Sequence, residues 1–487
     1  SVRYLQFRKE NPNISNNEAL LWTSKKMFWP ILYTVLTTIC AFLSLIFSEI
    51  KPIIDFGWMM TVGLLVSMSV TFTLLPTVLS ILEKKSMNYK DEKKSKITSF
   101  LSEVAQKNTK IIFSTAGLVI IISILGISKL EVENSFINYF DKKTEIYKGM
   151  KLIDDKLGGT TPLDVIVKFP NQKETETIED EFDSWEDDDA DDSKYWFTRN
   201  KIDIITRTHD YLDSLDSVGK VISFASMVRV AEDLNNGKKL QGLEMGVLYT
   251  KIPESIKKEI IDPYISIKNN EARISLRILD SKENLRRNEL IKKINYDLEN
   301  TIGLKKEEFK LAGVLILFNN LLQSLFKSQI LTLGAVMAGI TLMFLILFRN
   351  ITLSLIGVVP NFMAAFLILG IIGLLEIPLD MMTITIAAIT IGIAVDNSIH
   401  YIYRFKEEFN KNKNYNQTLE LCHNTVGVAI LNTSITIVFG FSILVLSNFI
   451  PTIYFGVFTG IAMLLAMLSV LTLLPKLILI IKPFGHE

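Results

Sequence analysis

The sequence predicts an α-helical polytopic membrane protein, built on a duplicated helical bundle, with one α+β domain outside the membrane. Eight apolar stretches are each long enough to cross a bilayer as a helix. A hydrophilic block of about 200 residues separates the third stretch from the fourth, and a segment near the start recurs near the end. Hydrophobic residues make up 49% of the chain and its net charge is zero, so nothing indicates a protein that binds nucleic acid.

The predicted spans are mostly joined by short connections. In chain order they cover residues 29–48, 53–82, 109–127, 329–348, 353–375, 381–402, 426–447 and 453–481. We therefore expect a cytoplasmic segment (1–28), a helix pair that ends one repeat (29–82), a basic linker (83–108), a third helix (109–128), an exterior porter-like domain (129–328), a five-helix bundle (329–482) and a cytoplasmic tail (483–487).

Lysine and arginine residues set the expected orientation, because short loops rich in them stay on the cytoplasmic side. Three connections carry them: Lys84, Lys85, Lys90, Lys93, Lys94 and Lys96 after the second span, Arg349 after the fourth, and Arg404, Lys406, Lys411 and Lys413 after the sixth. These connections share one side if the spans alternate in direction. The large block then lies outside, in the periplasm of a cell with an outer membrane. We expect a multi-pass protein of the inner (cytoplasmic) membrane.

The chain also contains a parallel repeat. Residues 29–79 match residues 428–478 at a constant offset of 399. The matched pairs include Pro52 with Pro451, Gly57 with Gly456, Pro76 with Pro475, Thr34 with Thr433 and Thr37 with Thr436. With a gap of two residues, residues 1–5 fall on residues 398–402. We therefore expect the chain to be a fragment that lacks the first four spans and a first exterior domain.

The exterior block reads as mixed α/β. Strands are expected at 162–169, 218–225, 271–279 and 309–317, and helices at 200–215 and 285–301. This strand–helix–strand order, given twice, predicts a ferredoxin-like split βαβ unit. The acidic run at 174–192 is interpreted as a solvated insertion, with binding of calcium or a cationic partner as the alternative.

The sequence shows no enzyme motif. It has no Walker lysine loop, no HExxH and no G-x-S-x-G elbow, and its two cysteines and four histidines are scattered. We expect no enzyme activity, no cofactor and no metal. The energy for any uphill transport must then come from an ion gradient or from a partner.

Asp396 is the residue most indicative of function. It interrupts the apolar stretch 381–402, where an ionised side chain costs about 2.5–3.5 kcal/mol on insertion scales. The alternative is a position near the helix end, with the carboxylate reaching interfacial water. Arg404 is eight residues further on, about 12 Å along a helix, which places Asp396 within the hydrocarbon. A carboxyl group in a medium of low dielectric can take up and release a proton, so we interpret Asp396 as a proton relay.

Several neighbours are expected to support this relay. Gly392, one turn earlier, would let another helix approach closely. In the seventh span, Thr433 and Thr436 lie at the depth of Asp396, and the alternative for both is a hydrogen bond to a carbonyl of their own helix.

Polar residues also flank the carboxylate on its own helix and in the fifth span. Pro360 is expected to kink the fifth span beside Asn361. Asn397 follows Asp396 directly, and we expect it to belong to the relay. His400 is expected at the headgroup boundary rather than in the relay.

The chain resembles the resistance-nodulation-division (RND) superfamily, and within it the MMPL-type and Patched-like exporters. The resemblance rests on Gly-x-x-x-Asp at 392–396 followed by Ser398-Ile399-His400-Tyr401, on the repeated Phe-Gly … Leu-Leu-Pro, on Ala312-Gly313 … Ser328-Gln329, and on Asn138-Tyr139-Phe140. It covers nearly the whole chain and implies proton-coupled export, with Asp396 paired to a residue of the family's fourth span. Many MMPL proteins have Tyr where this chain has Asn397, and drug-efflux relatives carry a second acidic neighbour. The first difference argues against a Tyr–Asp relay. This chain has no second acidic neighbour, which favours lipid-like cargo over multidrug efflux.

The expected function is therefore export of lipids or other hydrophobic molecules, driven by the proton-motive force. A translocation accessory of the SecDF type and a sterol-sensing or receptor-like module without active transport are the alternatives. The expected partners are a hydrophobic or lipid substrate, membrane lipids and the missing N-terminal half, with a periplasmic partner or a homo-oligomer left open. The sequence assigns no substrate-binding residues.

Overall fold

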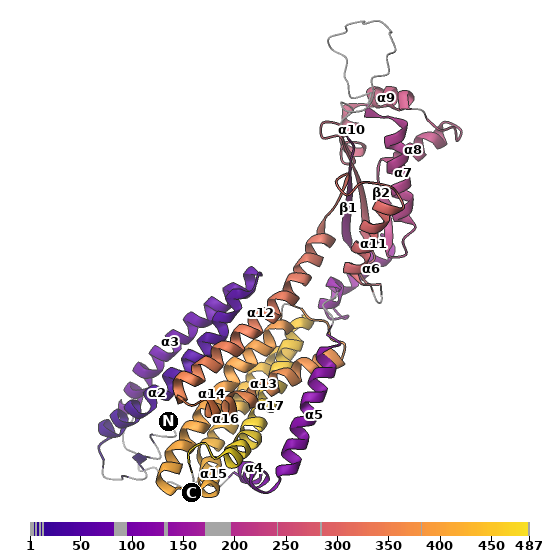
Figure 1. The fold of residues 1–487 in the computed structure, drawn as a ribbon. Coiled ribbons are helices and arrows are strands. Elements are labelled where there is room, and N and C mark those ends of the chain that lie inside the picture. Colours follow the sequence, from indigo (N-terminus) through magenta and orange to yellow (C-terminus); the bar gives the residue numbers. More distant parts are fainter. Residues whose placement is uncertain are drawn as a thin grey trace. The chain divides into compact units, whose positions relative to one another are not determined.

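A computed structural model describes residues 4, 7–8, 11, 14–81, 95–130, 135–170, 196–240, 242–282, 285–380 and 382–485. They divide into two compact units, which are treated separately below (Figure 1). The membrane unit comprises Ser1–Asn134 and Leu322–Glu487, and the α/β unit comprises Ser135–Leu321. The acidic run 174–192 lies outside the described residues.

The described chain contains eight helical segments that are long and apolar enough to cross a membrane. They are Asn16–Phe47 (α2 with a short 3₁₀ turn, η1), Lys51–Ile81 (α3), Thr109–Ile127 (α5), Val314–Phe348 (α12), Ile351–Leu374 (α13), Thr383–Asn412 (α14), Tyr415–Leu446 (α15, η5, α16 and η6) and Ile450–Ile481 (α17). The eight spans expected from hydropathy are confirmed. Several begin earlier than expected, because turns of mixed polar and apolar residues continue the helix beyond the most apolar stretch.

Helices α13 and α14 form the core of the membrane unit. Most residues in their apolar segments are buried, whereas none in the apolar segment of α3 is. Helix α13 also packs against α5 at very short range, since a Cβ atom on Gly370 would lie 2.7 Å from the Cα of Ser123. The apolar side chains exposed on α3, α5 and α16 are those expected to face lipid.

The internal repeat is reproduced in three dimensions. Helix α2 ends at Leu43 and α16 (Val428–Ser442) ends at Ser442, each followed by a 3₁₀ turn and then by α3 or α17 at the same offset of 399. Phe42 meets Phe56 edge-on at 6.0 Å and Phe441 meets Phe455 at 5.8 Å, both at 74°. Matching positions thus make matching contacts, as the sequence repeat predicts.

The α/β unit has the expected ferredoxin-like order. Its main elements are β1 (Thr161–Lys168), α7 (Arg199–Asp213), β2 (Val218–Ile222), β4 (Glu271–Ile278), α11 (Arg287–Asn300) and β5 (Phe309–Ala312), with a short β3 (Ile265–Ser266). The sheet runs β2-β4-β1-β5 with every pairing antiparallel. Alternate residues such as Leu163, Val165 and Val167 are fully buried in its core.

Two expected strands end earlier than predicted. The segment 218–225 leaves the sheet after Ile222, because Ser223 caps a helix with its side chain and α8 (Phe224–Leu234) follows. The segment 309–317 leaves it after Ala312, where Gly313 takes a φ of +105° and turns the chain into α12. Helices α6 (Glu145–Lys156), α9 (Gly242–Lys251) and α10 (Glu254–Ile260) were not predicted.

A buried polar network joins the start of the α/β unit to the end of β4. The Asp154 carboxylate accepts hydrogen bonds from the backbone N–H groups of Thr160 (2.9 Å), Asp280 (3.0 Å) and Ser281 (2.9 Å), and from the Thr160 hydroxyl (2.8 Å). Asp280 in turn pairs with the buried Arg287 and accepts from the Ser135 hydroxyl at 2.6 Å. Each of these two carboxylates therefore has several donors around it.

Candidate functional site

Asp396 lies on α14 where this helix packs against α2. The Thr38 hydroxyl of α2 lies 3.4 Å from Asp396 Oδ1 and 3.4 Å from the Gly392 carbonyl oxygen. A Cβ atom on Gly392 would come within 2.5 Å of the Ala41 Cβ, which is too close for two carbon atoms. Gly392 is therefore buried in a close helix contact, as its small size suggested.

Thr38 provides a polar neighbour for both forms of the carboxyl group. Its shortest hydrogen bond is donated to the carbonyl oxygen of Thr34, at 2.8 Å. A hydroxyl has one proton and two lone pairs, so the Thr38 oxygen can accept a hydrogen bond from protonated Asp396. When Asp396 is ionised, the Thr38 proton can turn towards it instead.

The threonines expected beside Asp396 are directed to their own helix. Thr433 donates to the carbonyl oxygens of Ala429 and Ile430, both at 3.0 Å, and Thr436 donates to that of Asn432 at 2.9 Å. Both side chains are exposed. The structure thus shows the intrahelical alternative for both residues, and no described contact joins either to Asp396.

Thr38 is the residue that sequence reasoning missed. The repeat pairs α2 with α16, so threonines in either helix could have faced Asp396. The structure places α2 against α14, with Thr34, Thr37 and Thr38 all buried. The adjacent Thr37-Thr38 pair was the available signal, but the repeat alone could not show which copy makes the contact.

Asn361 acts on α14 from the other side. It is fully buried in α13 and donates hydrogen bonds to the Gly357 carbonyl (2.9 Å) and to the Ser398 hydroxyl (2.8 Å), two residues beyond Asp396. Pro360 is buried beside it within α13. These residues hold the position of α14, and no hydrogen bond from them to Asp396 is present among the described residues.

A cavity of about 540 Å³ opens beside the carboxylate, and we call it the Asp396 cavity. It is lined by α2, α3, α14 and by residues between 425 and 437, which we call the α16 segment. Asp396, Asn397 and Thr433 all face it. Apolar residues such as Leu75 and Ile430 form much of its wall. Its opposite end is charged, with Lys26 Nζ 3.3 Å from Glu407 Oε1. The carboxylate thus shares a cavity with an ion pair some turns away.

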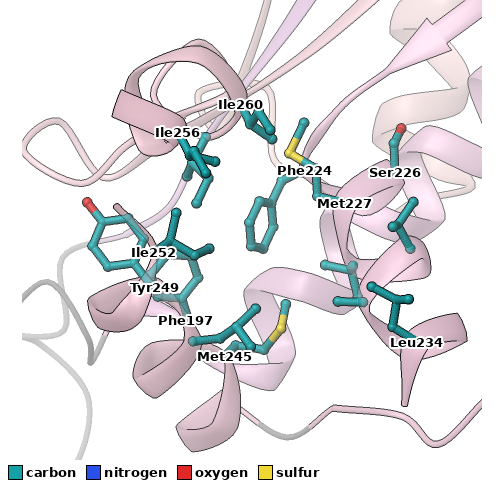
Figure 2. Close-up of a pocket in the computed structure, with 15 residues that line it drawn as sticks. Phe197, Phe224, Ser226, Met227, Leu234, Met245, Tyr249, Ile252, Ile256 and Ile260 are labelled. Carbon is teal, nitrogen blue, oxygen red and sulfur yellow. The ribbon is translucent and has the colours of Figure 1, made fainter. Parts of the chain in front are cut away.

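The α/β unit contains a second cavity, of about 430 Å³, which we call the apolar cavity. Figure 2 shows the Phe224 ring in its middle, with Ile252 and Ile256 on one side and Leu234 on the other. Phe224 is buried and forms the floor with Phe197, Met245 and Ile261. The rim is exposed and is also apolar; it includes Leu234, Val230, Leu248, Ile256 and Ile260.

The lining of the apolar cavity limits its ligands. Among the lining residues that the structure describes, only Ser226 and Tyr249 carry a side-chain oxygen or nitrogen, and none is charged. An ionised group would lose its hydration there without a partner. The described part of the chain also contains no cluster of His, Cys, Asp or Glu residues suited to a metal ion.

Comparison with known sequences gives a consistent result. The sequence model of the MMPL family matches residues 3–110 and 199–485. A protein of Methanocaldococcus jannaschii that is named only as a membrane protein is 25% identical over 397 residues, which cover 79% of this chain and 94% of that protein.

Solved structures share the fold at low sequence identity. Disp of the water bear Hypsibius dujardini, described as a hedgehog release protein, aligns with 95% of this chain at a TM-score of 0.58 and 15% identity. SecDF of Thermus thermophilus, described as a translocon-associated membrane protein, aligns with 99% at a TM-score of 0.52 and 10% identity. The chain spans 61% of the length of Disp and 52% of that of SecDF.

Proposed function

This chain belongs to the MMPL family and has the fold of an RND-type membrane transporter, and we propose that it exports lipids or other hydrophobic molecules by using the proton-motive force. In this proposal it is a multi-pass protein of the inner membrane and is not an enzyme. The α/β unit lies on the exterior side. Cargo enters there, and Asp396 couples its export to the inward movement of protons.

The observation that carries the proposal is the setting of Asp396. The half-buried carboxylate lies among membrane helices, and its one described polar contact is a neutral hydroxyl, that of Thr38. Within the described residues no Lys or Arg forms an ion pair with it. Lys26 pairs with Glu407, and Arg404 pairs with Glu407 and Glu408. Binding of a proton is then the direct way to neutralise Asp396 in a medium of low dielectric.

The apolar cavity supports the proposed class of cargo. Burial of an acyl chain stabilises the complex by about 0.8 kcal/mol for each CH₂ group, and the lining offers almost no competing polar contact. The volume falls within the range of small-molecule sites. An apolar cavity of this size favours a small hydrophobic molecule over an unfolded protein segment, and hence lipid export over a SecDF-like accessory role. The intramembrane carboxylate favours coupled transport over a receptor.

The test is efflux from proteoliposomes that contain the full chain, with a pyrene-labelled phospholipid as the probe and an imposed pH gradient. Asp396→Asn keeps the size of the side chain and removes its titration, so gradient-driven efflux should fall to background. Thr38→Val should reduce efflux partly, because it removes a neighbour and not the proton carrier. Thr436→Val is the control, because Thr436 belongs to the duplicate helix and has no described contact with Asp396, and it should leave efflux unchanged. Efflux of wild-type magnitude in Asp396→Asn would refute proton coupling through this residue.

A further inference from the structure

One face of α14 carries a row of polar residues that leads away from Asp396. His400 follows Asp396 by four residues, Arg404 follows by four more and Glu407 by three, which places all four on the same side of the helix. All four line the Asp396 cavity. Four residues of a helix advance about 6 Å along its axis. The row therefore extends from the carboxylate to the ion pair of Lys26 with Glu407.

His400 differs in its contacts from His423, the other histidine of the membrane unit that the structure describes. The His423 ring is fully buried, with Nε2 bonded to the Leu471 carbonyl at 2.9 Å and Nδ1 close to the Leu419 carbonyl and the Tyr401 hydroxyl. Its ring nitrogens are therefore engaged by the fold. His400 is half-buried, faces the Asp396 cavity, and has no hydrogen bond to any described residue. His400 thus lines this cavity, and its position at the headgroup boundary stays a prediction.

The other ionisable groups that line the Asp396 cavity are less suited to proton transfer than His400. They are Tyr4 near the start of the chain, Lys26 on α2, and Tyr403, Arg404 and Glu407 on α14; the described lining residues of α3 and the α16 segment contribute none. Lys26, Arg404 and Glu407 are tied in ion pairs. Of the described side chains that line this cavity, only the imidazole of His400 belongs to a type whose ordinary pKa lies close to neutral pH.

We propose that His400 is the proton-exchange group between Asp396 and the cytoplasmic solution, with the pair of Lys26 and Glu407 at the mouth of the path. This inference rests on the proposed proton coupling and deepens it. The carboxyl O–H bond of protonated Asp396 breaks, and its proton passes through water to the free nitrogen of neutral His400, where an N–H bond forms. The imidazolium then gives the proton on its other nitrogen to water at the mouth. Asp396 is left as a carboxylate and His400 is neutral again.

The experiment follows the protonation of Asp396 itself and needs no cargo. The full chain is reconstituted in lipid vesicles, the pH is changed rapidly, and the infrared band of the protonated carboxyl group is recorded with time. The band is assigned by its loss in Asp396→Asn. In His400→Ala and His400→Gln the rate of exchange should fall by at least about tenfold, and added imidazole should restore it in His400→Ala. Imidazole should have no effect on the wild type.

Tyr403→Phe is the matched control, since it changes another residue of the same lining and removes only a hydroxyl. Its rate should stay within about twofold of the wild type, well below the general effect of a lost acid–base group. An unchanged rate in His400→Ala and His400→Gln, a slowed rate that imidazole does not restore, or the absence of any titrating Asp396 band in the wild type would each overturn the proposal. Failure of the transport proposal would instead appear as normal proton exchange without gradient-driven efflux of lipid.

Discussion

Asp396 and Asp154 are carboxylates with opposite surroundings. Asp154 accepts hydrogen bonds from three backbone N–H groups and one hydroxyl, whereas Asp396 has a single long contact to a threonine hydroxyl. Several donors fix a charge in place, and a single hydroxyl that can also accept leaves the charge free to change. The residue with the weaker set of contacts is therefore the one suited to a proton cycle.

The pKa of Asp154 predicts a pH-dependent contribution to stability. Burial raises this pKa, but the hydrogen bonds from Ser281, Thr160 and Asp280 outweigh burial and hold it below its ordinary value. A carboxyl group whose pKa is lowered on folding stabilises the fold above its unfolded pKa of about 4, and loses this effect as the pH falls through the folded value. Asp154→Asn should therefore lower the free energy of unfolding at pH 7 by about 1–3 kcal/mol.

Thermal unfolding of the full chain in detergent at pH 7 and at pH 3 measures this effect. The difference between wild type and Asp154→Asn should shrink at the lower pH. Asp155→Asn is the control, because Asp155 is exposed and only forms a surface ion pair with Lys151. A difference for Asp154→Asn that is the same at both pH values would contradict a role for its charge.

The duplicated helices show how one local pattern serves two environments. Residues 29–43 of α2 match residues 428–442, which form α16. Both helices end in a 3₁₀ turn and make the same kind of aromatic contact. Thr34 and Thr37 are nevertheless buried in the first copy, whereas Thr433 and Thr436 are exposed in the second. The repeat therefore determines local structure, and the neighbouring helix determines which threonines are buried.

Helices α8, α9 and α10 follow β2 and precede β4 in the sequence. They supply most of the residues that line the apolar cavity. Leu234 of α8 is 83% exposed on its rim, so a substitution there should not disturb the core. We expect Leu234→Glu to weaken binding of the fluorescent fatty acid cis-parinaric acid by at least about tenfold, because a charge at the rim must lose hydration when the chain enters.

The matched control for this binding experiment is Leu152→Glu. Leu152 is 62% exposed on α6 and lies outside the apolar cavity. This substitution should leave the fluorescence titration unchanged. Equal affinity in wild type and Leu234→Glu would mean that the fatty acid binds elsewhere, and the cavity would no longer support the proposed cargo.

The described chain has eight candidate spans, and the α/β unit is inserted in the sequence after the third. The lysine- and arginine-rich connections fall after even-numbered spans, so in the proposed orientation they lie in the cytoplasm and the α/β unit lies outside. This orientation sets the direction of proton flow in the proposed function, since the charged end of the Asp396 cavity then faces the cytoplasm.

Cysteine labelling in intact cells tests this orientation. In a chain with Cys40 and Cys422 replaced by Ala, Lys306→Cys in the α/β unit should react with a membrane-impermeant maleimide. Lys406→Cys, near the end of α14, should react only after the membrane is permeabilised. Both positions are exposed, so access and not burial decides the outcome. The reverse labelling pattern would invert the orientation and with it the proposed direction of export.

The sequence by itself determined the number of spans, the repeat at offset 399 and the order of the ferredoxin-like unit, and it indicated Asp396 as the candidate site. Each of these depends on local hydropathy, on periodicity or on a charge in an apolar run. Only the tertiary structure decided that Thr38 and not Thr433 or Thr436 contacts the carboxylate, that His400 shares its cavity, and that α8 to α10 enclose an apolar space. The reason is physical: lipid-facing and helix-facing surfaces are equally apolar, so the pattern along a membrane helix does not reveal which neighbour it meets.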